Sequence, residues 1–323
     1  MRVREYGVLF ALALIWGASF LFIKIGVDEV SPATVVAGRL SFSVITLGII
    51  VAFRRELIQG WRRYWRLGIV VSLVNILAPY LLISWGETRI ASGTASILNA
   101  TTPLFTVLLA HVWIGDGHES LSVRRVSGTL IGFIGVGVLI GPTALLLTGN
   151  QAGDLWGELA VLIAAAAYGV GGLLSRGFSG SSRLVAPLLT QLPSLLISLV
   201  IASFWDPPTH LPSLKAILAI ATLGAMGTAV AYLLYFWLIH HVGATRTVLV
   251  TYLLPCTALI WGVLLLGEHV SWNALVGLVL VLFGTMTTNG TFSGLFGRIR
   301  GRGRRQTTLT PVGGATVAAG DDS

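Results

Sequence analysis

Long apolar windows separated by short polar connections are the main pattern of this chain. An α-helix needs about 20 mostly apolar residues to cross a lipid bilayer. Ten such windows follow one another: residues 6–26, 33–53, 67–86, 90–113, 124–141, 154–174, 184–204, 214–238, 244–266 and 271–289. The alternation of apolar and polar residues that marks a transmembrane β-barrel is absent. The pattern therefore predicts an all-α membrane protein with ten transmembrane helices.

Similar sequences occur at matched places in the two halves of the chain. Residues 80–85 read Tyr-Leu-Leu-Ile-Ser-Trp, and residues 232–237, which lie 152 positions later, read Tyr-Leu-Leu-Tyr-Phe-Trp. The same offset joins three further pairs: Trp16 and Tyr168, Lys24 and Arg176, Pro103 and Pro255. Each copy would hold five helices, and an odd number makes the second copy enter the membrane from the opposite side. We therefore expect two inverted five-helix repeats, at residues 1–141 and 154–289, joined by an extracellular linker at 142–153.

The composition supports a membrane protein. Apolar residues make up 54% of the 323 residues and charged residues only 11%, whereas a soluble domain carries about 25% charged residues. So few charges cannot cover a soluble surface, so most of the chain must face lipid or other helices. The single cysteine, Cys256, excludes an internal disulfide framework.

The basic residues predict the orientation of the chain. With the N-terminus in the cytoplasm, all but four of the 21 Lys and Arg residues fall in cytoplasmic connections or in the tail. Cytoplasmic loops of membrane proteins are enriched in these residues. The four exceptions are Lys24, Arg39, Arg89 and Lys215. We therefore expect a multi-pass protein of the plasma membrane with both termini in the cytoplasm.

The last part of the chain differs from the rest. Residues 297–323 are rich in Gly, Arg, Thr and Ala and have no apolar periodicity, which predicts a disordered basic cytoplasmic tail at 290–323. Its arginines could bind anionic membrane lipid, at about 1 kcal/mol per charge. Alternatively they only anchor the orientation.

Lys24 and Arg39 are basic residues inside the first two apolar windows. Charge at the centre of a spanning helix costs roughly 2.5–3.5 kcal/mol on insertion scales, so it points to a function. Arg39 lies about two turns into the second window and matches Gln191 in the second copy, and Lys24 matches Arg176. We hypothesise that Arg39 and Lys24 hold a negative group of the substrate and that Gln191 contributes to the same site. The alternatives are that Lys24 snorkels to the interface and that Arg39 binds helix-end carbonyls.

Other polar and aromatic residues are expected near the bilayer midplane. Such groups at the interface of two repeats are candidates for a substrate site. The candidates are Trp16, Asn75, Asn99, Tyr168, Tyr232 and Tyr252. The alternative for each is a hydrogen bond between helices or simple packing.

Proline and glycine suggest a hinge and close packing. Pro103 and Pro255 fall within matched windows, where each would free a backbone carbonyl and kink its helix. Gly128 and Gly132 in the fifth window are spaced for close helix contact. Only Gly277 and Gly284 remain in the tenth window, which predicts looser or different packing there. The glycines favour packing within the bundle, with a homodimer contact as the alternative.

Several kinds of chemistry have no counterpart in the sequence. No His-Glu-x-x-His or other metal-ligand spacing occurs, and no Gly-rich phosphate loop with Lys-Ser/Thr is present. We therefore predict no metal, no cofactor, no ATP drive within this chain and no nucleic-acid partner. Glu87 and Glu158 are the acidic residues nearest to membrane depth, and either could take a proton.

Short motifs in a doubled order resemble EamA-type carriers of the drug/metabolite transporter superfamily. The motifs are Trp16-Gly17 with Phe20 and Lys24, Pro32 with Arg39, residues 95–103 followed by Gly115-Asp116, and residues 247–255 with Gly267-Glu268. The resemblance covers residues 6–289. It implies ten helices, a central cavity and proton- or exchange-linked export of small metabolites or amino acids. Asp116 stands where Glu268 stands in the second copy, and the extension of that first-copy loop departs from the pattern.

These observations together predict a secondary active transporter, not an enzyme. It would export small metabolites or amino acids across the plasma membrane by alternating access, with a small-molecule substrate and membrane lipid as partners. A lipid flippase and an intramembrane lipid-modifying enzyme are the alternatives, although no catalytic constellation at membrane depth is evident.

Overall fold

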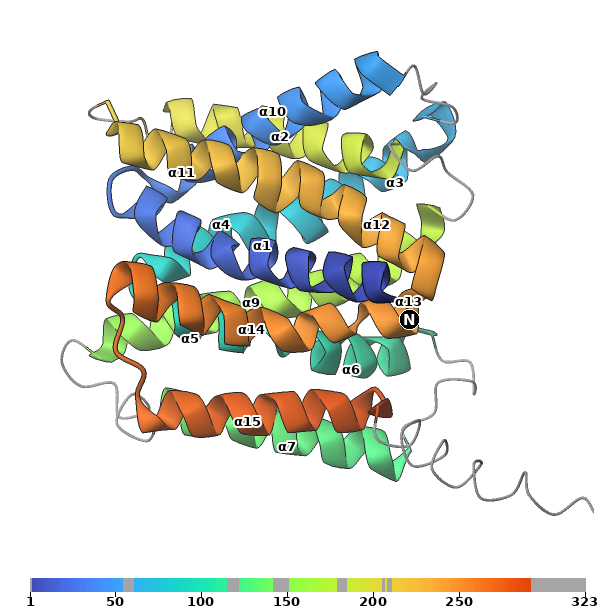
Figure 1. The fold of residues 1–323 in the computed structure, drawn as a ribbon, viewed down its shortest axis with the longest axis vertical. Helices are drawn as coiled ribbons and strands as arrows, with labels where there is room; N and C mark the ends of the chain where they lie inside the picture. The colour runs from blue at the N-terminus through green and yellow to red at the C-terminus, as the bar shows by residue number, and fades with distance from the viewer. Residues whose placement is uncertain are drawn as a thin grey trace, which may run out of the picture.

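A computed structural model describes residues 2–54, 61–114, 122–141, 151–178, 185–204, 207 and 211–291. Within these ranges all regular secondary structure is helical. The long helices run side by side across the view in Figure 1, with α7 and α15 at its lower edge and the N-terminus at the right. The linker residues 142–150, the loop that carries Asp116 and the tail after residue 291 lie outside the described residues.

The described part of the first copy contains seven α-helices and one π-helical segment. They are α1 (Val3–Val27), α2 (Pro32–Arg54), α3 (Trp61–Ser72), η1 (Leu73–Leu77), α4 (Ala78–Glu87), α5 (Ser92–Asn99), α6 (Thr102–Ile114) and α7 (Val123–Ile140). The π-helical segment η1 joins α3 to α4 without a break, so these three elements form one long span.

The second copy repeats this order. It contains α9 (Gln151–Ser175), η3 (Arg176–Phe178), α10 (Val185–Phe204), α11 (Leu214–Gly224), η4 (Ala225–Val230), α12 (Ala231–Val242), α13 (Ala244–Thr247), α14 (Leu249–Trp261), η5 (Gly262–Leu266) and α15 (Trp272–Thr288). The π-helical segment η4 joins α11 to α12 and starts 152 residues after η1 (73 to 225).

Within the described ranges, nine helices or continuous helix pairs are long and apolar enough to cross a membrane. They coincide with nine of the ten predicted windows. The tenth window corresponds to α15, which is apolar but has 17 residues.

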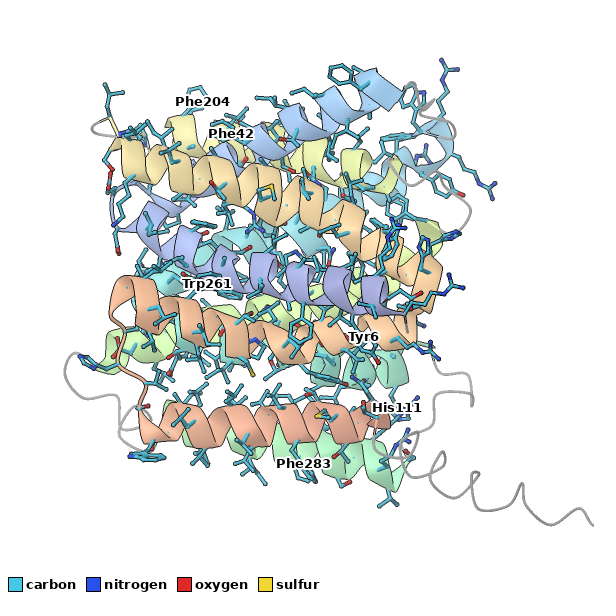
Figure 2. All side chains as sticks on the ribbon, viewed as in Figure 1. Tyr6, Phe42, His111, Phe204, Trp261 and Phe283 are labelled. Carbon is cyan, nitrogen blue, oxygen red and sulfur yellow. The ribbon has the colours of Figure 1, made fainter. Side chains whose placement is uncertain are left out.

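Large apolar side chains also cover much of the outside of the bundle. Phe204 at the upper edge and Phe283 at the lower edge of Figure 2 are 83% and 47% exposed. Such a surface is unfavourable in water but matches the acyl chains of lipid. The chain is therefore a multi-pass membrane protein.

Helix ends use local signals that recur in the two copies. The hydroxyls of Ser122 and Ser271 accept hydrogen bonds from the backbone N–H groups of Arg125 and Ala274 at the starts of α7 and α15. Such N-caps satisfy donors that have no partner inside the helix. At the other end of α7, Gly141 has φ +75°, a conformation that favours glycine.

Equivalent helices of the two copies pack against equivalent partners. Helix α1 packs against α14 and α12, and its counterpart α9 packs against α6 and α4. Helix α3 packs against α10, and α11 packs against α2. The pairs α2 with α10 and α7 with α15 join equivalent helices directly.

Glycines bring α7 and α15 into close contact. A Cβ atom at Gly128 would collide with Thr288 and with the carbonyl oxygen of Gly284, and one at Gly277 would collide with Leu139. Glycines of α7 therefore lie against glycines and backbone of α15, and those of α15 against α7. The prediction of looser packing for the tenth window is wrong, because its two glycines face glycines and backbone of the fifth.

Candidate functional site

Arg39 lies at the centre of the candidate site. It is 8% exposed, and its Nε donates a hydrogen bond of 2.8 Å to Oγ1 of Thr228 in η4. The Thr228 hydroxyl in turn donates to the carbonyl oxygen of Leu223 at 3.1 Å, so it is an acceptor for Arg39. The guanidinium carbon lies 3.6 Å from the ring centroid of Tyr80, within the range of a cation–π contact. Among the described residues, no carboxylate forms an ion pair with Arg39.

Three tyrosines from three helices gather near this guanidinium. Tyr80 of α4 is buried in a cluster with Val36 and Leu40 of α2, and Tyr168 of α9 and Tyr232 of α12 pack against that cluster. Tyr168 and Tyr232 both lie within electrostatic range of Tyr80 and Arg39. The structure thus brings three predicted residues together, namely Arg39, Tyr168 and Tyr232.

Tyr80 and Thr228 are members of this group that were not predicted from the sequence. Tyr80 could have been found, because it is the first-copy counterpart of the candidate Tyr232. Thr228 has no such signal, since its first-copy counterpart is the apolar Ile76.

Gln191 occupies the position in α10 that matches Arg39 in α2. It is fully buried, and its Oε1 accepts a hydrogen bond of 2.6 Å from the hydroxyl of Ser43. Its Nε2 is enclosed without a hydrogen-bond partner. Three residues after Gln191 in α10, the hydroxyl of Ser194 lies 2.6 Å from the hydroxyl of Ser72 in α3. These bonds join α2, α3 and α10.

Trp16, Asn75 and Asn99 contact other parts of the bundle. The Trp16 ring centroid lies 5.4 Å from that of Tyr235. Asn75 belongs to η1 and packs so closely on α9 that a Cβ atom at Gly171 would collide with it. Asn99 ends α5, and its Oδ1 is enclosed without a partner.

Tyr252 contacts the end of α15. Its hydroxyl accepts a hydrogen bond of 2.8 Å from Nδ2 of Asn289, the C-cap of that helix, and lies 3.3 Å from the hydroxyl of Thr291. Its hydrogen bonds therefore join α14 to α15, away from the Arg39 group.

Lys24 joins α1 to the end of α4. Its Nζ donates a hydrogen bond of 2.8 Å to the main-chain oxygen of Glu87 and lies 3.5 Å from Oδ1 of Asp28. Glu268, which follows η5 in the second copy, joins that copy to α5 of the first. Its carboxylate accepts hydrogen bonds of 2.7 and 3.1 Å from the backbone N–H groups of Ser92 and Gly93. A carboxylate at the N-terminus of α5 is favoured by the helix dipole.

The two prolines have different surroundings. Pro255 lies inside α14, as predicted. Pro103 lies in the first turn of α6, after a break at Ala100 and Thr101 that separates α6 from α5. Both prolines thus lie within candidate membrane spans, Ser92–Val112 and Leu249–Leu266, and the helix is interrupted just before Pro103. The interruption that the copies share is the pair of π-helical segments, η1 and η4.

The described residues include no group of three or more His, Cys, Asp or Glu side chains that could hold a metal ion.

Comparison with known proteins identifies the family. The EamA-like transporter family matches the chain twice, at residues 4–141 and 155–290. An uncharacterized transporter of Bacillus subtilis strain 168, YoaV, is 23% identical over 287 residues, which cover 88% of this chain and 96% of the relative. An uncharacterized inner membrane transporter of Escherichia coli K12, YedA, is 26% identical over 288 residues, covering 85% and 89%.

Two further comparisons extend this result. A probable terminal-alkyne amino-acid exporter of Streptantibioticus cattleyicolor is 26% identical over 309 residues, covering 92% of this chain and 94% of the relative. A protein of known crystal structure has the same fold, with a TM-score of 0.63, 19% identity and coverage of 91% of this chain and 99% of that chain. The chain therefore belongs to the EamA-like transporter family and contains two copies of its domain.

Proposed function

We propose that this protein is a secondary active transporter that exports small metabolites with a carboxylate group, amino acids among them, by alternating access. The observation that carries the proposal is the environment of Arg39. An arginine stays charged at any relevant pH, and an unpaired buried charge costs several kcal/mol. Thr228 uses one of the five N–H donors of the guanidinium. A substrate carboxylate would take two of the remaining four in the bidentate geometry that arginine favours.

The tyrosines define the rest of the proposed site. The rings of Tyr80, Tyr168 and Tyr232 offer apolar faces and hydroxyls to the non-carboxylate part of a small molecule. Among the remaining candidates, Trp16, Asn75 and Asn99 would contribute to the path around the site, and Lys24, Gln191 and Tyr252 would hold helices in place. The name of the Streptantibioticus cattleyicolor relative as an amino-acid exporter supports this class of substrate.

The architecture that we propose is ten transmembrane helices in two inverted repeats, 1–141 and 154–289. Equivalent helices of the two copies have equivalent packing partners, which supports a two-fold relation between the copies. Helix α15 packs along α7 and its 17 residues reach about 25 Å, close to the thickness of the hydrocarbon core. The matched segments η1 and η4 are the proposed sites of bending, with Pro103 and Pro255 as further hinge positions.

We also propose that the protein lies in the plasma membrane with both termini in the cytoplasm. The N-terminus lies at the right of Figure 1, and the guanidinium carbon of Arg4 lies 5.1 Å from the ring centroid of Trp237 in α12. Most basic residues of the sequence fall in the connections that the N-in orientation places on this side. The positive-inside rule places that end in the cytoplasm. The linker at 142–153 would then be extracellular and the basic tail cytoplasmic.

The proposal can be tested by counterflow in proteoliposomes. Vesicles are loaded with the 20 unlabelled amino acids, the same acids in isotope-labelled form are added outside, and internal label is read by mass spectrometry. We expect saturable accumulation of some acids and none of the corresponding amides, which lack the carboxylate.

Arg39→Gln places the second-copy residue at position 39 and should reduce counterflow at least 100-fold while the protein remains folded. The matched control is Arg89→Gln, because Arg89 also lies over an aromatic ring, that of Trp85 at 3.9 Å, but is exposed. Normal counterflow in Arg39→Gln would contradict the proposal. Movement of labelled phospholipid without amino-acid counterflow would favour a lipid flippase.

A further inference from the structure

The start of α3 exposes a repeated pair of side chains that has no role in the proposal above. Trp61 is followed by Arg62, and one turn later Trp65 is followed by Arg66; all four side chains are exposed. Each guanidinium carbon lies near the ring centroid of the tryptophan before it, at 5.6 Å for Arg62 and 5.4 Å for Arg66. Among the described residues, no carboxylate forms an ion pair with either arginine, so their N–H donors are available to a ligand.

The buried side of α3 fixes the rotation of this helix. Tyr64 and Val71 are buried in a cluster with Phe178. A Cβ atom at Gly68 would collide with Leu189 of α10. The opposite side carries residues at spacings of four, three and four, which share one face of a helix: Arg62, Arg66, Ile69 and Leu73. The two charges therefore lie in line with exposed apolar side chains.

This face changes along its length in the order of the parts of a phospholipid. The arginines and tryptophans come first, and Ile69, Val70 and Leu73 follow as exposed apolar side chains. A helix rises 1.5 Å per residue, so Leu73 lies about 10 Å further along the helix axis than Arg66. That length fits an acyl chain below its headgroup, since half of the hydrocarbon core is about 15 Å thick. Tryptophan rings are enriched at headgroup level, which places the arginines beside the phosphates.

The matched helix of the second copy, α11, lacks this feature. The positions that match the two Trp–Arg pairs hold Ser213, Leu214, Ile217 and Leu218, and the basic residue of this helix is Lys215. The three apolar residues are exposed as well, so an exposed helix face of this bundle does not require Trp–Arg pairs. Figure 1 shows α3 near the end that carries the N-terminus and α11 near the opposite end. The pairs therefore distinguish one end of the bundle from the other.

A phosphate group fits the two arginines. Arginine binds phosphate oxygens through two parallel N–H donors. Side chains one turn apart have Cβ atoms about 5–6 Å from each other, so both guanidinium groups can reach the same phosphate. Residues 54–66 carry five arginines against one acidic residue, Glu56. This excess of positive charge favours a headgroup with net negative charge over a zwitterionic one, whose amine it repels.

We propose that the exposed face of α3 is a binding site for one anionic phospholipid of the leaflet at the end of the bundle that carries the N-terminus. The lipid phosphate lies between Arg62 and Arg66, and the two tryptophan rings lie beside it at headgroup level. One acyl chain follows Ile69 and Leu73. This inference goes beyond the proposed transport function and does not depend on it.

Native mass spectrometry of the purified full-length protein measures this binding. Wild type in detergent is titrated with dioleoyl phosphatidylglycerol, which is anionic, and separately with dioleoyl phosphatidylcholine, which is zwitterionic and has the same chains. We expect the first phosphatidylglycerol molecule to bind roughly tenfold more tightly than phosphatidylcholine. Each charge near a membrane surface changes affinity about fivefold, so Arg62→Gln combined with Arg66→Gln should weaken phosphatidylglycerol binding roughly 25-fold.

The matched control combines Arg2→Gln with Arg4→Gln. It removes the same charge at the same end of the bundle, and Arg4 also lies over an indole ring, that of Trp237 at 5.1 Å. Residues two apart on a helix do not face each other, so this variant should bind phosphatidylglycerol within about twofold of wild type. Arg62→Lys combined with Arg66→Lys keeps the charge and should retain most of the binding, which guards against misfolding of the glutamine variant. The basic tail is present in every variant, so the comparison isolates α3.

A competition with inorganic phosphate distinguishes a lipid from a free anion. We expect phosphate to displace phosphatidylglycerol no better than chloride does at the same ionic strength. Stronger displacement by phosphate would indicate a site for the free anion and would overturn the assignment to lipid. Equal affinity of wild type for the two lipids would also overturn the inference, and so would equal losses of phosphatidylglycerol binding in the α3 glutamine variant and in the Arg2, Arg4 control.

Discussion

Arg39 in α2 and Gln191 in α10 occupy matched positions of the two copies, but their surroundings differ. Arg39 keeps 8% exposure and lies against Tyr80 and Thr228. Gln191 is fully enclosed and binds Ser43. Duplication thus preserved a polar position in each copy, whereas only Arg39 carries a charge, and the amide nitrogen of Gln191 is enclosed without a partner. The difference teaches that a symmetric fold can hold an asymmetric site.

The largest effect is expected when a charge is placed at the second-copy position, 191. Gln191→Arg would place a guanidinium where no surface is exposed and one acceptor is present. Truncated or unmatched buried ion pairs cost roughly 3–5 kcal/mol, so we expect loss of most folded protein. Melting followed by size-exclusion fluorescence would measure this. Arg39→Gln is the reciprocal control and should melt near wild type. A stable Gln191→Arg protein would show that the two positions are equivalent.

A smaller effect is expected from the ring beneath Arg39. Tyr80→Leu removes a cation–π contact that is worth about 2 kcal/mol when desolvated, which predicts a fall of roughly tenfold or more in counterflow at low amino-acid concentration. Tyr80→Phe keeps the ring and should retain most activity. Tyr232→Leu, at the matched second-copy position, should have the weaker effect. Equal losses in the two leucine variants would show that both copies contribute equally to the site.

The smallest effect is expected at the second-copy position. Ser43→Ala leaves Oε1 of Gln191 buried without its donor, and such a loss costs about 1 kcal/mol. We expect a slightly lower melting temperature and unchanged counterflow. A strong loss of counterflow in a stable Ser43→Ala protein would instead place Gln191 in the transport site.

The sequence predicted most of the fold because lipid leaves the backbone few choices. Each window must satisfy its own hydrogen bonds, so apolar length alone indicates a helix, and nine windows became helices long enough to span. The prolines show the limit of this reasoning. Pro103 falls in a first turn, where a missing N–H is tolerated, and whether the preceding residues leave the helix depends on neighbouring elements.

The site was predicted only in part. Arg39, Tyr168 and Tyr232 were found from charge and repeat position, and the structure brings them together around Tyr80. Thr228 was missed, because a threonine in an apolar helix usually bonds its own backbone and carries no signal of its own. Tyr252 was grouped with them, although its hydroxyl binds Asn289 at the end of α15.

The sequence by itself determined the class of protein, the duplicated module and the positions where charge enters apolar helices. These depend on local properties, namely the length of apolar runs, the spacing of a repeat and the cost of a charge in lipid. Only the tertiary structure decided which polar residues meet. It placed Arg39 over Tyr80, left the Glu87 carboxyl without a partner and bound Lys24 to a main-chain oxygen. Those outcomes depend on the rotation and depth of each helix against its neighbours, which the packing of many side chains sets together.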